Sequence, residues 1–255
     1  MVTLTTIILP RLEFHFLKEW IDHHLTLGVQ NINIYDNGEY PVTSPDAHWL
    51  EEDVKELVQK RHMYRTSSKK LVWDKKPHLN YFDDIPYTEI QDRIHDISNM
   101  YKEVSIIPWV CGVDHNYGYP ESQKQMLMSE LENGTGWLLN MDPDEFLNLP
   151  AYDNLHNLIQ GKKYNHFYFG QYTGARREVN VPIKELKVYE NFRPPERKLG
   201  RKWLCHLDKC KQHIPCKGLV HNLNFKNPVG KICTNDEAYF IHYKADGIDN
   251  EKTTI

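Results

Sequence analysis

TLTTIILP (residues 3–10) and QNINIY (residues 30–35) decide the fold class of this chain. The first stretch is β-branched and apolar, which predicts a buried strand. Apolar residues then recur at helical spacing from Leu12 to Leu27, and Gly28 is a natural end for that helix. The second stretch alternates along its length, which predicts another strand, and the turn signal Asp36-Asn37-Gly38 follows it. Strand, helix and strand in succession form a βαβ unit, which predicts an α/β fold with a mostly parallel sheet flanked by helices.

Further helices and strands alternate along the rest of the chain. The ranges expected for them are 51–61, 88–100 and 121–132 for helices, and 104–110, 166–172 and 238–242 for strands. Beyond Pro194 the pattern weakens into basic segments broken by Pro and Gly. Since no linker or repeat interrupts the chain, a single domain over residues 1–255 is expected.

The composition is that of an ordinary globular protein, with 40% hydrophobic and 26% charged residues in a chain of 255. The net charge of −4 gives no general attraction for nucleic acid, so no nucleic-acid partner is expected. No apolar run approaches the roughly 20 residues that span a bilayer, so no transmembrane segment is expected. Residues 4–10 lack the basic start of an export signal, and the five cysteines are an odd number. These features predict free thiols and a cytoplasmic protein, or a soluble catalytic fragment of a larger one.

A group of cysteines in the second half could in principle hold zinc, and its members are Cys205, Cys210, His213 and Cys216. The group does not begin with the usual C-x₂-C spacing, and no second group follows it. Buried or idle thiols are therefore the favoured interpretation.

The stretch WLLNMDPDEF (residues 137–146) carries the chemistry. A short apolar strand runs directly into Asp142, Asp144 and Glu145, beside Pro143, which cannot continue a ladder. Carboxylates this close together repel one another unless a cation lies among them, and oxygen ligands suit Mg²⁺ or Mn²⁺. Because such an ion most often serves a phosphate, the stretch predicts a D-x-D metal and nucleotide-diphosphate site. The alternative is an acidic turn that binds nothing.

Asp36 follows the second strand as Asp142 and Asp144 follow a later one. Ligands of open α/β sheets bind beyond the carboxyl ends of the strands. We therefore expect these three carboxylates to share one cleft.

Several segments of the first 37 residues together resemble the opening of one family, the GT-A glycosyltransferases of the family 2-like and family 92 (DUF23) group. That opening usually reads K-N-E, E-W, H, G-V and I-Y-D-N. The matching segments are Arg11-Leu12-Glu13, Leu17–Ile21, His23-His24-Leu25, Leu27-Gly28-Val29 and Ile34-Tyr35-Asp36-Asn37.

The later part of the chain continues this resemblance. Trp137 with residues 142–147 is similar to the W…D-x-D-E-F block of the family, and Gln123 matches a Gln that precedes it. His221 and the segment Ile241-His242-Tyr243 resemble the late H and N-H-Y segments. The chain departs from the family pattern at three positions, where Leu12, Pro143 and Ile241 replace Asn, Ile and Asn.

The resemblance implies a GT-A (Rossmann-like) fold for residues 1–255. Residues 1–110 would mainly bind the nucleotide, with an insertion at about 61–100, and residues 111–255 would form the metal and acceptor half. It implies transfer of a sugar, with inversion, from a nucleotide-diphosphate sugar to a hydroxyl of a glycan or glycoconjugate acceptor, with Mn²⁺ or Mg²⁺. The alternatives are a nucleotidyltransferase and a non-catalytic carbohydrate-binding domain with a degenerate site. A glycine-rich phosphate loop, usual in the former, is missing near Pro10.

The resemblance also assigns roles to individual residues. The metal-site candidates are Asp142, Asp144 and His242. Asp144 would bind the metal directly, Asp142 would contact the ribose or a metal-bound water, and His242 would complete the metal shell, with His221 as its competitor. Asp36 would accept hydrogen bonds from the base or ribose, unless it only forms the turn that follows it.

Other candidates surround these. Glu13 would shape the base pocket, unless it is only an acid favoured at a helix N-terminus. The residues that could hold the diphosphate are Arg176, Arg177, Arg201 and Lys202, although each could equally be a solvated charge. Inversion needs a carboxylate base away from the metal, for which Glu178 and Asp208 are the candidates.

Overall fold

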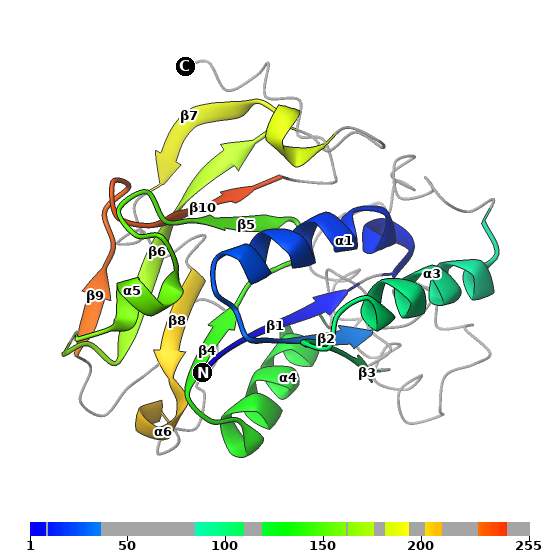
Figure 1. Cartoon of the computed structure of the whole chain (residues 1–255), viewed down its shortest axis with the longest axis horizontal. Coiled ribbons are helices and arrows are strands. Elements are labelled where there is room, and N and C mark those ends of the chain that lie inside the picture. The colour runs from blue at the N-terminus through cyan, green and yellow to red at the C-terminus, as the bar shows by residue number, and fades with distance from the viewer. Residues whose placement is uncertain are drawn as a thin grey trace, which may run out of the picture.

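The computed structural model of this chain is a mixed α/β fold (Figure 1). The residues it describes are 1–8, 10–36, 85–109, 119–161, 163–175, 182–193, 202–210 and 229–243. In this part of the chain, no helix has both the length and the apolar character needed to cross a membrane.

The first half of the sheet is parallel. Its strands are β1 (Val2–Ile8), β2 (Asn31–Asp36), β3 (Val104–Pro108) and β4 (Trp137–Asn140), in the spatial order β3-β2-β1-β4. From β1 the chain moves outward through β2 to β3, and then returns to place β4 on the other side of β1. The direction of winding therefore reverses between β1 and β4, and the carboxyl ends of two such strands form the crevice in which open α/β sheets bind ligands.

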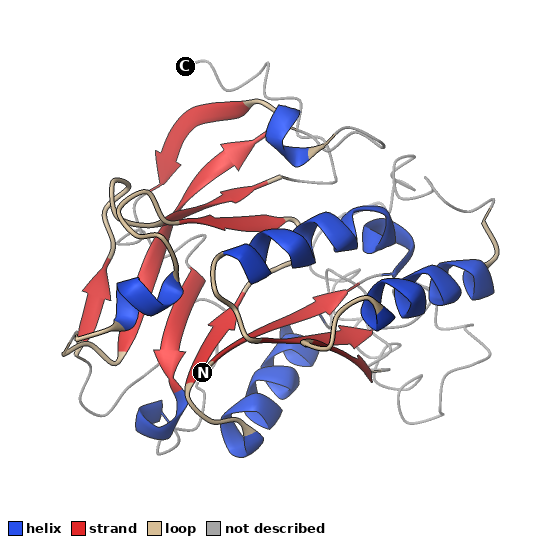
Figure 2. Cartoon of the chain, viewed as in Figure 1, coloured by secondary structure: helices blue, strands red, loops and turns tan. Residues whose placement is uncertain are grey.

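Helices cover both faces of this half, as Figure 2 shows. Helices α1 (Pro10–Thr26) and α3 (Tyr87–Asn99) pack on one face, and α4 (Tyr119–Asn133) packs on the other. The alternation of β1 explains the two layers, because Leu4 packs in the core beneath α1 and Ile7 packs in the core beneath α4. Helix α1 ends at Gly28, whose φ of 88° is the left-handed conformation that glycine adopts without strain.

The second half of the sheet is mixed. Its strands are β5 (Glu145–Asn148), β6 (His166–Gly174), β7 (Val188–Arg193), β8 (Lys202–His206), β9 (Gly230–Ile232) and β10 (Tyr239–His242). The order continues from β4 through β8, β6 and β10 to β5, and β7 and β9 also pair with β6. Strand β8 is antiparallel to both β4 and β6, whereas β10 is parallel to β6 and antiparallel to β5. The short helices of this half are α5 (Leu155–Ile159), η2 (Ile183–Glu185) and α6 (Leu207–Cys210).

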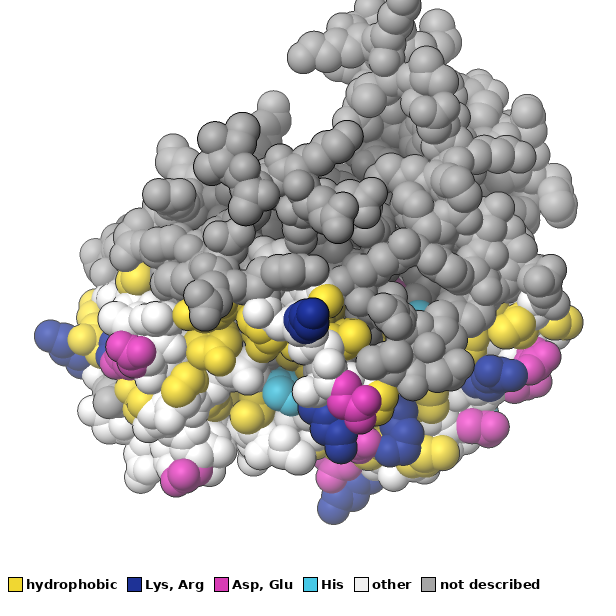
Figure 3. All heavy atoms as spheres, turned by 90° about the horizontal axis from the view of Figure 1, so that it is seen from above, with side chains coloured by type: hydrophobic (Ala, Val, Ile, Leu, Met, Phe, Trp, Pro, Cys, Tyr) yellow, Lys and Arg dark blue, Asp and Glu magenta, His cyan; other side chains and the backbone are white. Residues whose placement is uncertain are grey.

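Charged side chains of both signs are mixed on the described part of the face in Figure 3. Ion pairs one helical turn apart join Lys18 to Asp22 on α1 and Arg93 to Glu89 on α3. Exposed pairs of this kind stabilise a helix by only a few tenths of a kcal/mol, roughly 0.2–0.5. The stability of the fold therefore comes from its two buried layers.

The α/β class and the flanking helices are confirmed, and every element expected within the described residues is present. The expected helix over 51–61 lies outside them, as does most of the insertion at about 61–100. Strands β5, β7, β8 and β9 were not expected, and β5, β7 and β8 add antiparallel pairs to the mostly parallel sheet. Of the possible zinc ligands, Cys205 is a buried free thiol in the layer beneath α4, whereas His213 and Cys216 lie outside the described residues.

Candidate functional site

The acidic motif lies at the reversal point of the sheet. Asp142 and Asp144 follow the carboxyl end of β4, beside β1. The chain turns here, with the backbone N–H of Glu145 donating to the carbonyl of Asp142 at 3.0 Å, and then enters β5. The cluster therefore sits where the topology alone places a ligand crevice.

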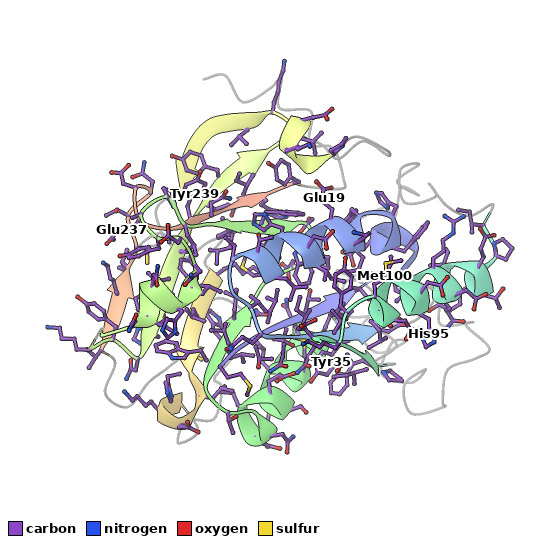
Figure 4. The ribbon with its side chains drawn as sticks, viewed as in Figure 1. Glu19, Tyr35, His95, Met100, Glu237 and Tyr239 are labelled. Carbon is purple, nitrogen blue, oxygen red and sulfur yellow. The ribbon has the colours of Figure 1, made fainter. Side chains whose placement is uncertain are left out.

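Strand pairing brings a histidine to this turn. Strand β10 runs antiparallel to β5, and His242 is the register partner of Glu145. The next residue, Tyr243, donates its backbone N–H to the carbonyl of Asp144 at 2.8 Å. In Figure 4, β10 begins at the labelled Tyr239 and runs toward helix α1, which carries Glu19. Helix α1 also contacts the motif. The indole N–H of its Trp20 donates to the backbone carbonyl of Glu145 at 2.9 Å.

Asp144 and His242 form a pair at the edge of the cluster. The imidazole Nε2 of His242 lies 3.0 Å from Asp144 Oδ2. The side chain of His242 is 22% exposed and that of Asp144 is 19% exposed. The other ring nitrogen, Nδ1, lies 3.2 Å from the amide Nε2 of Gln171. Burial opposes a charge on His242, but Asp144, Glu145 and Asp142 outweigh it and raise its pKa to about 9. The neighbouring carboxylates therefore favour the protonated imidazole.

Asp142 and Glu145 form a second pair, which is held by a buried lysine. Lys202 is 1% exposed, and its Nζ lies 2.8 Å from Asp142 Oδ2 and 2.9 Å from Glu145 Oε2. Gln123 donates to the other oxygen of Asp142 at 2.8 Å, and the backbone N–H of Asp142 donates to Glu145 Oε2 at 2.8 Å. The acidic motif is thus divided into two carboxylates that share one ammonium and a third carboxylate, Asp144, that pairs with a histidine.

Burial and mutual contact shift the pKa values of Glu145 and Lys202. Desolvation raises the pKa of Glu145 to about 7, although Lys202 pulls in the opposite direction. Desolvation also acts against the charge on Lys202, but the two carboxylates prevail and raise the pKa of its ammonium. The two carboxylates therefore favour the charged form of Lys202.

The side chains of the motif can be tested for their fit to a divalent ion. Both oxygens of Asp142 are engaged by Lys202 and Gln123. Among the described residues, no three His, Cys, Asp or Glu side chains are grouped as a metal cage. Asp144 and His242 remain as two neighbouring donors, and Mg²⁺ and Mn²⁺ accept one or two protein ligands when phosphate oxygens and water supply the rest. The residues therefore fit an ion that is held jointly with a phosphate ligand.

Two other predicted residues lie on the same edge of the sheet. Asp36 is the last residue of β2, and it is the register partner of Ile8 at the end of β1. Glu13 lies in the first turn of α1, directly after that end of β1. The structure thus brings Asp36 to the carboxyl edge that carries Asp142, as expected from the sequence, and it also places Glu13 there.

Asp208 is not brought to this edge. Because β8 is antiparallel to β4, its last residue, His206, pairs with Trp137 at the start of β4. Asp208 follows in α6, beyond the amino end of β4, with a side chain that is 54% exposed (Figure 1). A base at this end of the sheet cannot reach a substrate at the other, so Asp208 is no longer a candidate. The other candidates, Glu178, Arg176, Arg177, Arg201 and His221, lie outside the described residues.

Sequence reasoning missed the role of one residue and the burial of another. Lys202 was a candidate for holding diphosphate oxygens, but its ammonium is directed at two carboxylates of the protein. Glu145 is 3% exposed although it follows an acidic turn. A lysine that opens the short apolar run KWLCH was the available signal, because a lysine in a buried strand requires an acidic partner.

Comparisons with known proteins give no family. No family model matches the chain, and no curated protein matches it. Among solved structures, an apo UDP-glucose pyrophosphorylase aligns over 95% of this chain and 90% of its own, at 9% identity and a TM-score of 0.32. UDP-glucose pyrophosphorylase from Acinetobacter baumanii aligns over 95% and 85%, at 10% identity and a TM-score of 0.33. UDP-glucose pyrophosphorylase complexed with UDP-glucose aligns over 95% and 90%, at 10% identity and a TM-score of 0.31. Likenesses this low assign neither a fold family nor a function to the chain.

Proposed function

We propose that this protein is a glycosyltransferase that binds a nucleotide-diphosphate sugar at the carboxyl ends of β1, β2 and β4. The observation that carries the proposal is the meeting of Asp144 with His242 beside the reversal point of the sheet, at 3.0 Å. A donor pair at a ligand crevice suits a metal-bound diphosphate, and the likeness of the sequence to GT-A glycosyltransferases supplies the reaction class.

In this proposal Asp36 and Glu13 face the base and ribose, because they lie on the same edge as the acidic motif. Asp144 and His242 hold Mn²⁺ or Mg²⁺ together with the diphosphate. When bound, the ion supplies positive charge to the diphosphate leaving group. Asp142 is held in place by Lys202 and Gln123 and presents its remaining surface to the ribose or to water.

The reaction is a single displacement at the anomeric carbon of the sugar. The bond from that carbon to the phosphate oxygen breaks, and a bond to the acceptor oxygen forms on the opposite face. The hydroxyl proton passes to a carboxylate base, and the nucleoside diphosphate leaves with the bonding electrons. Glu178 is the candidate base that we retain, within a single catalytic domain that spans residues 1–255.

The test is product analysis. The purified protein is incubated with Mn²⁺, a panel of sugar nucleotides and a mixture of glycan acceptors, and the nucleotides are separated by chromatography. We expect release of a nucleoside diphosphate and a mass increase in one acceptor. Asp144→Ala should abolish both, whereas the exposed Asp96→Asn on α3 should change neither.

Other outcomes contradict the proposal in distinct ways. Formation of a nucleoside triphosphate on addition of pyrophosphate, without acceptor modification, would identify a nucleotidyltransferase. Binding of a sugar nucleotide or glycan without any turnover would identify a binding domain. A folded protein that neither binds nor converts any nucleotide sugar would overturn the site itself.

A further inference from the structure

Lys202 is an unusual component of an acidic cluster that is proposed to take a metal. It opens β8, next to the carboxyl end of β4, because the following residue Trp203 pairs with Asn140. Its side chain is 1% exposed, so its ammonium is shielded from solvent. A buried ammonium requires paired carboxylates, and this one contacts Asp142 and Glu145 at 2.8 and 2.9 Å.

The ammonium of Lys202 contacts two carboxylates of the motif, and the third pairs with a histidine instead. Asp142 and Glu145 share one cation, and Gln123 and the backbone of the turn also contact them. Asp144 contacts His242 and is the acid of the motif for which a contact with Lys202 is not observed. An ion drawn to the cluster therefore meets one carboxylate and one imidazole, while Lys202 occupies the other two carboxylates.

We propose that Lys202 is the built-in counter-ion and positioning residue of this cluster, which keeps Asp142 and Glu145 out of metal coordination and leaves Asp144 and His242 for the ion. This inference deepens the proposed function and rests on it, because it assigns the metal to Asp144 and His242 and excludes the other two carboxylates of the motif. It follows that the protein binds Mn²⁺ weakly by itself, and that added phosphate oxygens complete the coordination shell.

Removal of the ammonium should convert the cluster into a metal site. In Lys202→Met, Asp142 Oδ2 and Glu145 Oε2, which lie 2.8 and 2.9 Å from the ammonium, lose their cation, so Mn²⁺ can take the place of the ammonium between them. We expect Lys202→Met to bind Mn²⁺ in the absence of any nucleotide at least about tenfold more tightly than the unsubstituted protein, as measured by titration calorimetry.

Three further variants make the test specific. Lys202→Arg keeps the positive charge and should show no gain in Mn²⁺ affinity. Lys102→Met removes a lysine that is 91% exposed, and it should also show no gain. Adding Asp142→Asn to Lys202→Met should remove the gain, a result that a merely structural lysine would not give.

The inference can also be tested if Lys202→Met does not fold. If Lys202→Met is unfolded in EDTA by circular dichroism, Mn²⁺ should restore its folding, because the ion replaces the missing charge. A variant that stays unfolded in Mn²⁺, or that folds and gains no affinity for Mn²⁺, overturns the inference. Tight binding of Mn²⁺ alone to the unsubstituted protein also overturns it. Since no nucleotide or acceptor is present, failure here is distinct from failure of the proposed transfer reaction.

Discussion

At the scale of single residues, the acidic motif shows how two aspartates two positions apart acquire different chemistry. Asp142 is held by a lysine and a glutamine, both within 2.8 Å, whereas Asp144 is held by a histidine at 3.0 Å. Imidazole can give up its proton and become a metal ligand, but an ammonium inside an ion pair cannot. The pair that can change its state, Asp144 with His242, is therefore the pair that we assign to the ligand.

This assignment predicts that Asp144→Asn weakens the binding of a nucleoside diphosphate in Mn²⁺ by at least about tenfold, because one of two protein ligands is lost. In EDTA the unsubstituted and variant proteins should bind the nucleotide equally weakly. Fluorescence titration with and without the metal measures both. Asp96→Asn is the matched control, and an equal loss in that variant would count against the assignment.

The buried histidine of β6 gives a prediction for pH. His166 is 3% exposed, and desolvation lowers its pKa to about 4. The unfolded chain, with a pKa near 6.5, binds the proton more readily, so the stability from this group is present above about pH 6.5 and lost as the pH falls toward 4. The free energy of unfolding should therefore fall by about 1.4 kcal/mol per pH unit across this window from His166 alone.

Urea denaturation at several pH values between 7 and 4 measures this slope. In His166→Gln the slope should become shallower, because that residue does not titrate. The same substitution at the exposed His95, labelled in Figure 4, should leave the slope unchanged. Equal slopes in the unsubstituted protein and in His166→Gln would show that His166 is not the titrating group.

At the scale of elements, the strands that build the site were predictable to different degrees. Strand β1, helix α1 and strand β2 carry long periodic patterns, so their sequence was sufficient to identify them. Strands β5 and β8 are four and five residues long, and short runs of this kind give no distinct period. The antiparallel direction of β8 was likewise invisible in the sequence, and that direction is what removes Asp208 from the site and brings in Lys202.

Strand β6 contacts the end of β10, and this contact predicts that a substitution in β6 changes both stability and nucleotide binding. A Cβ added at Gly174 would overlap the ring of Tyr243, whose backbone N–H donates to the carbonyl of Asp144 at 2.8 Å. Gly174→Ala should therefore lower the free energy of unfolding by about 1–3 kcal/mol and also weaken metal-dependent nucleotide binding. Thermal unfolding and nucleotide titration measure the two effects.

Gly161→Ala is the matched control for this variant. A Cβ at Gly161 meets nothing within 4 Å, but the φ of 65° makes the substitution unfavourable by about 1–2 kcal/mol. It should lose stability without losing nucleotide affinity. Loss of both in Gly161→Ala would mean that stability alone explains the effect at Gly174.

At the scale of the whole molecule, the strand order is what unites the candidate residues. The winding reverses between β1 and β4, so segments that are distant in the sequence end at one edge, among them Asp36, Asp142 and His242. The sequence could predict the first two at that edge, because each follows a recognisable strand. It could place His242 there only by resemblance to a family, since the pairing of β10 with β5 is a long-range contact.

The measurement that tests the central claim most directly is thermal unfolding of the unsubstituted protein against a panel of sugar nucleotides, each with Mn²⁺ and with EDTA. A ligand that binds only the folded state raises Tm with its occupancy. We expect one nucleotide to raise Tm in Mn²⁺ and not in EDTA, with little effect of Mn²⁺ alone. A folded protein whose Tm responds to no nucleotide in Mn²⁺ would contradict the site at the carboxyl ends of β1, β2 and β4.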